Sequence, residues 1–338
     1  MSIKFTLKNT FGAAFSLLAL GTVSTVNAQS LEGAGATFPK PIYLKWFAAF
    51  KTATGTTVNY NGVGSGAGVK ALKDKTVDFG ASDAPLSAVE EGQMPGGVVH
   101  IPTVGGAVVL GYNAAGVPAN LKLTGEIISE IYLGKIKTWN DNKIKSANPG
   151  VSLPGTGIVP IHRTDGSGTT YIFTHYLKKA SSEWASGPGA GKSVNWPIGL
   201  GGKGSDGVAA QVKHSDGAIG YFELAFAKSN NLPYAEVKNK AGKYVIATPA
   251  STTAAISQYI GQLNKDIKTP TVDAPGADSY PICSLTYILL YKNAKPASVK
   301  LWDWAMKSAQ QDQAAGLYYA PLPASLVKRN EAVLKTLK

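Results

Sequence analysis

One short stretch of the sequence gathers the residue types that hold an anion, Arg163-Thr-Asp-Gly-Ser-Gly-Thr169. It combines a guanidinium, a carboxylate, hydroxyls and glycines, and it precedes a segment, 170–179, with helical apolar spacing. The N–H groups at a helix N-terminus lack partners and carry partial positive charge, so they attract oxyanions. The stretch is therefore consistent with an anion-binding loop, a nucleophile loop built on Ser167, or a helix cap.

Three more glycine- or hydroxyl-rich loops stand before predicted helices. They are Gly33-Ala-Gly-Ala-Thr-Phe-Pro39, Gly62-Val-Gly-Ser-Gly-Ala-Gly68 and Asp78-Phe-Gly-Ala-Ser-Asp-Ala-Pro85. Each alone is explained by capping, because Ser, Thr and Asp are the usual N-cap residues. Four such loops in one chain, with glycines that let a ligand approach the backbone, favour a binding site.

The patterns of common nucleotide-binding and hydrolytic sites are mostly missing. The segment Gly187–Ser193 is one residue too short for a P-loop, and Ser65 and Ser167 lack the first glycine of a G-x-S-x-G elbow. The segment Gly199–Gly204 matches G-x-G-x-x-G, but so short a pattern is expected by chance in a glycine-rich chain, and we interpret it as a loop.

Metal chemistry is not indicated either. The four histidines, His100, His162, His175 and His214, do not fall at metal-ligand spacing, and the single cysteine, Cys283, lies far from them in sequence. Ser167 thus has no visible general base, which disfavours a hydrolase. The sequence predicts no metal, no cofactor and no catalytic residue.

Length and charge narrow the class further. A chain of 338 residues favours two lobes over one core. The net charge is +12, yet charged residues make up only 16% and the lysines form no block, which argues against a nucleic-acid partner. Cys283 cannot form an internal disulfide, and its apolar neighbours predict a buried structural thiol.

The N-terminal residues predict export. Lys4 and Lys8 precede an apolar run, 11–20, and a small-residue ending, Val26-Asn-Ala28. This is the pattern of a secretory signal peptide, here residues 1–28. The run is short for a membrane span and no cysteine follows it to take a lipid, so we expect a soluble, exported protein without a lipid anchor.

Strand-like and helix-like segments alternate along the chain, which predicts an α/β protein with mainly parallel sheets. Helices are expected at 38–52, 69–73, 126–133, 170–179, 208–213, 253–263, 298–309 and 326–337, and strands at 57–60, 77–81, 98–103, 106–112, 158–162, 218–222 and 284–291.

Taken together, the loops resemble the phosphate-binding proteins of bacterial ABC-type phosphate transporters, the PstS family. The motifs that carry the resemblance span most of the chain in family order. They are GAGATFPKP (33–41), VNYNGVGSGAGVK (58–70), VDFGASDAPL (77–86), IYLGKIKTWND (131–141), RTDGSGT (163–169), WPIGLGGKG (196–204) and GAIGY (217–221).

The resemblance implies a two-lobed periplasmic binding protein fold with two hinge crossovers and a ligand cleft between the lobes. Lobe I would comprise 29–111 and 283–338, and lobe II 112–282. The implied function is binding of inorganic phosphate in the periplasm by a monomeric, non-catalytic receptor. That receptor would close on its ligand and deliver it to an inner-membrane ABC permease complex.

The resemblance also implies which residues bind phosphate. From lobe I these are Thr37, Phe38 through its backbone N–H, Ser65 and Asp83. From lobe II they are Arg163, Ser167, Gly168 and Thr169, with Asp165 orienting Arg163. His162 departs from the expected basic or apolar neighbour, but on a strand it would point away from Arg163.

These residue types suit phosphate, which at neutral pH always keeps a proton to donate. The Asp83 carboxylate can accept that proton, whereas sulfate has none and would leave the carboxylate unpaired. Two alternatives remain open at this point: a receptor for another oxyanion such as sulfate, and a secreted phosphohydrolase.

Overall fold

The computed structural model describes residues 1–4 and 30–337 of the chain. The predicted signal peptide, 1–28, falls almost entirely outside these residues. Within the described part, no helix has both the length and the apolar character needed to cross a membrane.

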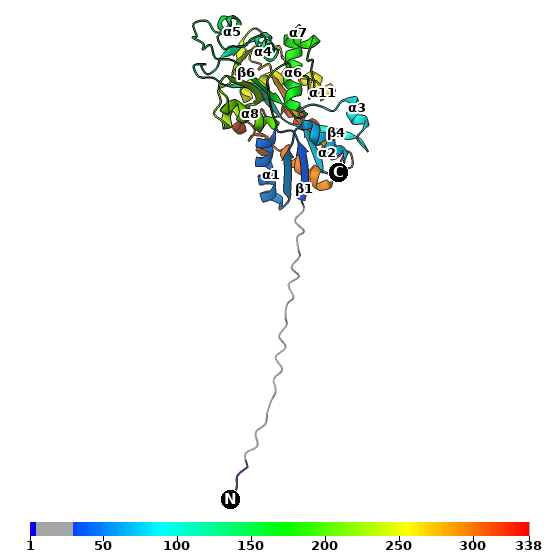
Figure 1. The fold of residues 1–338 in the computed structure, drawn as a ribbon. Coiled ribbons are helices and arrows are strands. Elements are labelled where there is room, and N and C mark those ends of the chain that lie inside the picture. The colour runs from blue at the N-terminus through cyan, green and yellow to red at the C-terminus, as the bar shows by residue number, and fades with distance from the viewer. Residues whose placement is uncertain (5–29, 338) are drawn as a thin grey trace.

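The described residues form an α/β fold, whose path Figure 1 traces from blue to red. The strands are β1 (Ser30–Gly35), β2 (Thr57–Gly62), β3 (Phe79–Ser82), β4 (Val98–Asn113), β5 (Lys122–Leu123), β6 (Val159–Arg163), β7 (Leu200–Gly202), β8 (Ala218–Glu223), β9 (Glu236–Lys238), β10 (Tyr244–Val245) and β11 (Cys283–Tyr291). The helices up to residue 186 are α1 (Lys40–Thr54), α2 (Ser65–Lys73), α3 (Ala88–Gly92), α4 (Gly125–Tyr132), α5 (Asn142–Ala147), α6 (Gly168–Ala180) and α7 (Ser182–Ser186). The later helices are α8 (Gly204–His214), α9 (Leu224–Ser229), α10 (Pro249–Ser257), α11 (Ile260–Lys265), α12 (Pro296–Ala305), α13 (Ser308–Gln311) and α14 (Ala324–Lys335), with a 3₁₀ turn at Ala315–Leu317.

One long strand, β4, joins two half-sheets. The described strands form an eight-stranded sheet in the order β2-β1-β3-β11-β4-β8-β6-β7 and a small sheet β10-β9-β5. Residues 98–107 of β4 pair with β11, whereas residues 108–113 pair with β8. We call the half-sheet on the β11 side, with the helices packed on it, the first lobe, and its counterpart on the β8 side the second lobe. The two-lobed α/β fold expected from the sequence is confirmed.

Parallel pairing prevails within each half-sheet, as expected, whereas the strands at the centre of the eight-stranded sheet pair antiparallel. Each lobe has parallel pairs, β1 with β2 and β3, and β6 with β7 and β8, but β11 and β4 run antiparallel to their neighbours. The expectation of parallel pairing therefore fails only where β11 and β4 join the two half-sheets.

The two strands expected at 98–103 and 106–112 are a single strand, β4. The two expected strands leave Val104 and Gly105 between them, and the adjacent glycines Gly105 and Gly106 weaken the apolar pattern there. In the fold both glycines make room for neighbours: a Cβ on Gly106 would lie 2.4 Å from the Phe38 ring, and one on Gly105 would lie 2.2 Å from Ile256. Packing, not a turn, requires glycine at these positions.

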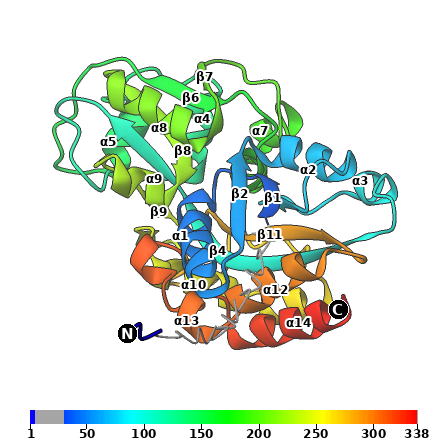
Figure 2. The same cartoon turned by 90° about the horizontal axis from the view of Figure 1, so that it is seen from below.

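The helices expected at 253–263 and 298–309 are each broken, into α10 and α11 and into α12 and α13. The lobe boundaries remain a prediction. Helices α10 and α11 belong to the predicted 112–282 segment, yet α10 packs on β4 and β11, and α11 packs on α14. In Figure 2, α10 lies in the half of the molecule that holds α12, α13 and α14, away from α4, α5 and α8. Packing therefore groups these two helices with the first lobe.

The core runs through both lobes, and the expected burial of Cys283 is confirmed. This residue has no exposed surface, and burial raises the pKa of its thiol to about 12. The thiol donates to the carbonyl of Tyr280 at 3.4 Å. Such a thiol stays protonated and unreactive at neutral pH.

Candidate anion-binding site

The four glycine- and hydroxyl-rich loops meet where the two lobes face each other. Three of them follow the parallel strands β1, β2 and β3, so they leave the same edge of the first half-sheet. The fourth follows β6 and opens α6 in the second lobe. The backbone N–H of Gly66 donates to the carbonyl of Gly166 at 2.8 Å, so the loops of opposite lobes touch directly.

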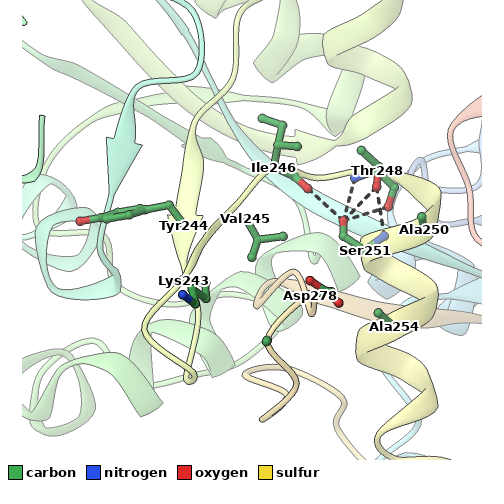
Figure 3. A pocket seen from close by; sticks show the side chains of 10 residues that line it. Lys243, Tyr244, Val245, Ile246, Thr248, Ala250, Ser251, Ala254 and Asp278 are labelled. Carbon is green, nitrogen blue, oxygen red and sulfur yellow. Dashed lines mark hydrogen bonds between the residues drawn. The ribbon is translucent and has the colours of Figure 1, made fainter.

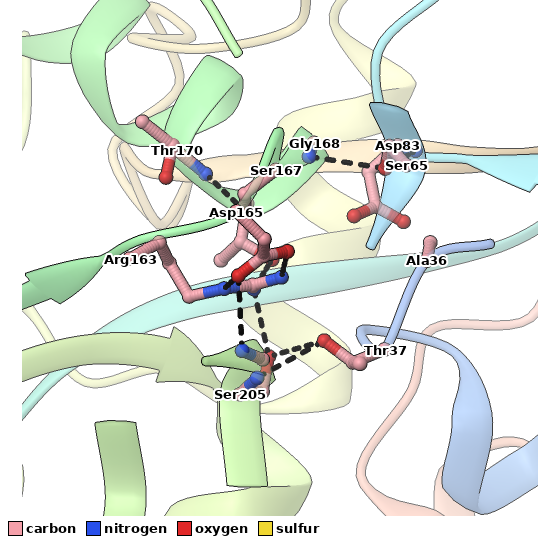
Figure 4. A network of polar contacts seen from close by, with 12 residues as sticks. Ala36, Thr37, Ser65, Asp83, Arg163, Asp165, Ser167, Gly168, Thr170 and Ser205 are labelled. Carbon is pink, nitrogen blue, oxygen red and sulfur yellow. Dashed lines mark hydrogen bonds and ion pairs between the residues drawn. The ribbon is translucent and has the colours of Figure 1, made fainter. Parts of the chain in front are cut away.

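Arg163 and Asp165 form a two-bond pair in this interface, as Figure 4 shows. Nε of Arg163 donates to Oδ1 of Asp165 at 2.8 Å, and Nη2 donates to Oδ2 at 2.5 Å. Burial raises the pKa of Asp165, but the bonds from Arg163 and from the N–H of Gly204 outweigh it and lower the pKa below its usual value. The carboxylate therefore stays ionised and fixes the guanidinium plane.

The other terminal nitrogen of Arg163 reaches two hydroxyls. Nη1 donates to Thr169 Oγ1 and to Ser205 Oγ, each at 3.3 Å. Ser205 belongs to α8, and its hydroxyl oxygen accepts the O–H of Thr37 at 3.1 Å. Thr37 comes from the first lobe, so this chain of bonds ties the lobes together.

Ser65, Gly168 and Asp83 make a second contact between the lobes. The hydroxyl oxygen of Ser65 accepts the N–H of Gly168 at 3.0 Å and the N–H of Asp83 at 3.3 Å. A Cβ added to Gly168 would lie 2.6 Å from Ser65 Oγ and from Asp83 Oδ2. Glycine is therefore the only residue type at position 168 that permits this approach without a shift of the neighbouring atoms.

Asp83 is a buried carboxyl group with a raised pKa. Its exposed fraction is 1%, and Thr286 donates to its Oδ1 at 2.8 Å. Burial raises the pKa of Asp83 to about 7, although the Thr286 bond and the charge of Arg163 act to lower it. Near neutral pH the group can either accept or donate a proton.

Ser167 and Phe38 also lie in this buried region. The Ser167 hydroxyl oxygen accepts the N–H of Thr170 at 3.0 Å, so it caps α6. The carbonyl of Phe38 accepts the hydroxyl proton of Tyr319 at 2.6 Å. The residues predicted from sequence are thus brought together at one interface. They are Thr37, Phe38, Ser65, Asp83, Arg163, Asp165, Ser167, Gly168 and Thr169, and all except the partly buried Asp165 are buried.

Two residues of this interface were missed by sequence reasoning. Ser205 follows the segment Gly199–Gly204, which the sequence predicts only as a loop but which contains β7, and Ser205 lies in the first turn of α8. A glycine-rich segment directly before a helix was the signal that could have found it. Thr286 gave no signal, because it lies within an apolar strand, β11, and only pairing of that strand with β3 brings it to Asp83.

His162 does not join the site. Its ring stacks on Trp196 with a centroid distance of 4.9 Å. Within the described ranges, no group of three or more His, Cys, Asp or Glu side chains is arranged to hold a metal.

A hollow of about 710 Å³ lies away from the four loops, between the strand β10 and helix α10. Figure 3 shows its lining, which includes Tyr244, Thr248 and Ser251 and none of the predicted binding residues. The side chains of Thr248 and Ser251 form the capping box of α10, and the Ser251 hydroxyl also donates to the carbonyl of Ile246 at 2.9 Å.

The chain matches one family model and is similar in sequence to named relatives. Residues 22–310 match the model of the PBP superfamily domain. The "Phosphate-binding protein PstS" of Pasteurella multocida is 42% identical over 328 residues, which cover 95% of this chain and 93% of the relative. The protein of the same name from Haemophilus influenzae is 41% identical over 96% of this chain and 98% of the relative.

Solved structures agree on the fold. A high-affinity periplasmic phosphate-binding protein, PfluDING, solved with phosphate, has a TM-score of 0.70 at 20% identity and covers 90% of this chain and 93% of its own. An ABC-type phosphate transport receptor from Vibrio cholerae has a TM-score of 0.55 at 16% identity, over 87% of this chain and 100% of its own. With the sequence relatives above, the chain belongs to the PstS family of the PBP superfamily.

Proposed function

We propose that this protein is a receptor for inorganic phosphate, which it binds between its lobes and delivers to an inner-membrane ABC permease for import. Relatives that share about two fifths of its residues over nearly their whole length are named for phosphate binding. The resemblance assigns the ligand contacts to Thr37, Phe38, Ser65 and Asp83 of the first lobe. From the second lobe it assigns Arg163, Ser167, Gly168 and Thr169, with Asp165 in support.

The observation that carries the proposal is that one buried guanidinium, that of Arg163, and one buried carboxyl group, that of Asp83, lie in the same interface among neutral hydrogen-bond donors. Arg163 would supply charge attraction for the anion. Asp83, with its pKa raised to about 7, would share a proton with it. One proton between Asp83 and the anion suffices, whichever group carries it. Phosphate brings that proton at neutral pH, whereas sulfate does not.

The closed arrangement supports binding by lobe closure. Gly168 and Thr37 lie on opposite lobes, and their polar groups bond to Ser65 and Ser205 across the interface. Only a closed state can present donors from both lobes to one anion, so phosphate would stabilise closure by its higher affinity for that state.

We propose a non-catalytic role because Ser167 is engaged as a helix cap. Its hydroxyl oxygen accepts the Thr170 N–H, and its own N–H donates to the carbonyl of Lys192. No histidine or carboxylate is hydrogen-bonded to this hydroxyl in the described residues, so nothing is placed to remove its proton. This argues against a phosphohydrolase.

We also propose where the protein acts, its oligomeric state and the bounds of its lobes. The relatives are named as phosphate-binding proteins of the PstS type, and a structural neighbour is described as periplasmic. We infer export by the predicted signal peptide, residues 1–28, to the periplasm and function there as a monomer. The lobe boundaries 29–111 with 283–338 and 112–282 belong to this proposal too, with the α10–α11 segment packed on the first lobe.

Calorimetric titration of the mature protein with phosphate and with sulfate, beside a phosphatase assay, tests the proposal. We expect tight phosphate binding, weak sulfate binding and no release of phosphate from phosphate esters. Preferential sulfate binding would favour the other-oxyanion receptor, and turnover would favour the hydrolase.

A further inference from the structure

Ser205 lies at the junction of the two lobes. It is the second residue of α8, and no part of it is exposed. Figure 4 shows it joined by dashed lines to Thr37 of the first lobe and to Arg163 of the second. Its backbone N–H donates to Thr37 Oγ1 at 3.0 Å, and its Oγ contacts both Thr37 and Arg163.

The hydrogen bonds of this hydroxyl leave one group unused. A serine hydroxyl has two acceptor positions and one hydrogen. Arg163 Nη1 and Thr37 Oγ1 both donate to Ser205 Oγ, at 3.3 and 3.1 Å, so both acceptor positions are taken. The hydrogen has no acceptor among the described residues. A buried donor without an acceptor is costly, and a ligand that accepts from it would remove that cost.

The usual reason for a serine at the start of a helix does not apply. A capping hydroxyl accepts a backbone N–H one turn ahead. The N-cap position of α8 is Lys203, no side chain caps this helix, and Ser205 Oγ accepts from two side chains instead. Ser167 and Thr124, by contrast, cap their helices in the ordinary way.

We infer that Ser205 is a further phosphate-binding residue, whose hydroxyl donates to an oxygen of the anion while it accepts from Thr37 and Arg163. The inference rests on the proposed function and extends its set of ligands to α8. Thr37 and Arg163 come from opposite lobes, so this set of bonds exists only when the lobes are closed. Ser205 therefore acts mainly by slowing the dissociation of the bound anion, and less by speeding its association.

Two substitutions test this role. Ser205→Ala removes the hydroxyl, and Ser205→Cys keeps the shape of the side chain, with a somewhat larger atom, but makes a poor hydrogen-bond donor. A hydrogen bond to a charged group is worth about 1.5–3 kcal/mol, so both variants should raise the phosphate dissociation constant roughly 10- to 100-fold. The rise should appear in the dissociation rate, followed by stopped-flow release, with the association rate within about threefold of wild type.

Ser182→Ala is the matched control, because Ser182 is an exposed first-turn serine of α7. Urea unfolding without phosphate shows whether each variant folds like wild type. A change in dissociation constant below about fivefold for Ser205→Ala, or wild-type release by Ser205→Cys, would overturn the inference. Failure of the wild-type protein to bind phosphate would instead overturn the proposed function.

Discussion

The hydroxyl oxygen of Ser65 accepts the backbone N–H of Gly168 at 3.0 Å, and the two residues belong to opposite lobes. The same oxygen accepts the N–H of Asp83, so one serine joins the start of α6 to the acidic loop after β3. Groups proposed to bind phosphate thus bond to each other in the closed structure. Phosphate must exchange these bonds for its own, and the close packing of Gly168 decides whether closure is reached.

Replacement of Gly168 by alanine should block closure. The new Cβ would lie 2.6 Å from both Ser65 Oγ and Asp83 Oδ2, which is closer than real contacts allow. The lobes would have to stay apart, so we expect a phosphate dissociation constant raised by about 100-fold or more. Calorimetry gives the constant. Gly261→Ala in α11, where a Cβ meets nothing within 4 Å, is the control and should bind normally.

Replacement of Asp83 by asparagine should weaken the discrimination between phosphate and sulfate. The amide can donate as well as accept, so sulfate no longer faces an unpaired carboxylate. We expect the ratio of the sulfate to the phosphate dissociation constant to fall by about tenfold at pH 8, because a pKa of about 7 leaves about one tenth of Asp83 protonated there. Titrations with each anion at pH 8 measure this ratio. An unchanged ratio would remove Asp83 from its proposed role.

Sulfate binding by the unaltered protein should depend on pH through Asp83. The pKa of Asp83 is raised to about 7, so below that pH the neutral acid can donate to sulfate. Above it, sulfate can bind only if a proton is taken up, and its affinity should fall about tenfold for each further pH unit. Phosphate carries its own proton and should show a weaker dependence. Competition titrations from pH 5 to 9 test this, and a flat sulfate profile would contradict it.

An ion pair between the lobes, Glu90 with Lys192, should slow phosphate release. Glu90 belongs to α3 of the first lobe, and both side chains are about three-quarters covered. Burial raises the pKa of Glu90, but its bonds with Lys192 and Ser87 lower it more, so the carboxylate is ionised at neutral pH. Glu90→Gln should speed release by about two- to fivefold, and high salt should diminish the difference.

The control for this pair is Asp74→Asn. Asp74 pairs with Lys70 within one lobe, at i and i+4, so closure neither makes nor breaks that contact. The Asp74→Asn variant should release phosphate at the same rate as the unaltered protein at every ionic strength. Equal rates of phosphate release from the Glu90 variant and from this control would show that the ion pair does not hold the lobes closed.

The buried acid Glu223 should make the empty protein less stable as pH rises. Its Oε2 accepts the Ala225 N–H at 2.7 Å, and burial raises its pKa well above the usual value, although the bonds from Ala225 and Tyr319 act to lower it. The unfolded chain loses this proton at a lower pH than the folded chain. Stability is therefore full below the unfolded pKa of about 4.3 and decreases with rising pH up to the folded pKa.

Glu223→Gln should remove this part of the pH dependence. The amide oxygen can keep the bond from Ala225, and the side chain stays neutral at every pH. Between pH 5 and 8 the fall in unfolding free energy should become smaller, by up to about 1.4 kcal/mol per pH unit. Urea unfolding without phosphate measures it. The variant Glu126→Gln, whose carboxylate is 65% exposed, should keep the original dependence.

The sequence by itself determined the loops and the family. Loops of glycine and hydroxyl residues before helices can be recognised from the adjacent sequence alone, because helix capping and anion attraction depend on residues that are close in the chain. That is why the stretch Arg163–Thr169 and the residues Thr37, Ser65 and Asp83 were identifiable. The fold class and the burial of Cys283 followed from composition and apolar pattern in the same way.

Only the tertiary structure decided how β4 and β11 pair and which distant residues meet. Thr286 reaches Asp83 because β11 inserts between β3 and β4, and nothing local to residue 286 encodes that pairing. Ser205 meets Thr37 across 168 residues of sequence because the lobes close. Contacts of this kind arise from long-range burial and strand pairing, which act through the whole core and leave no periodic pattern in the residues that make them.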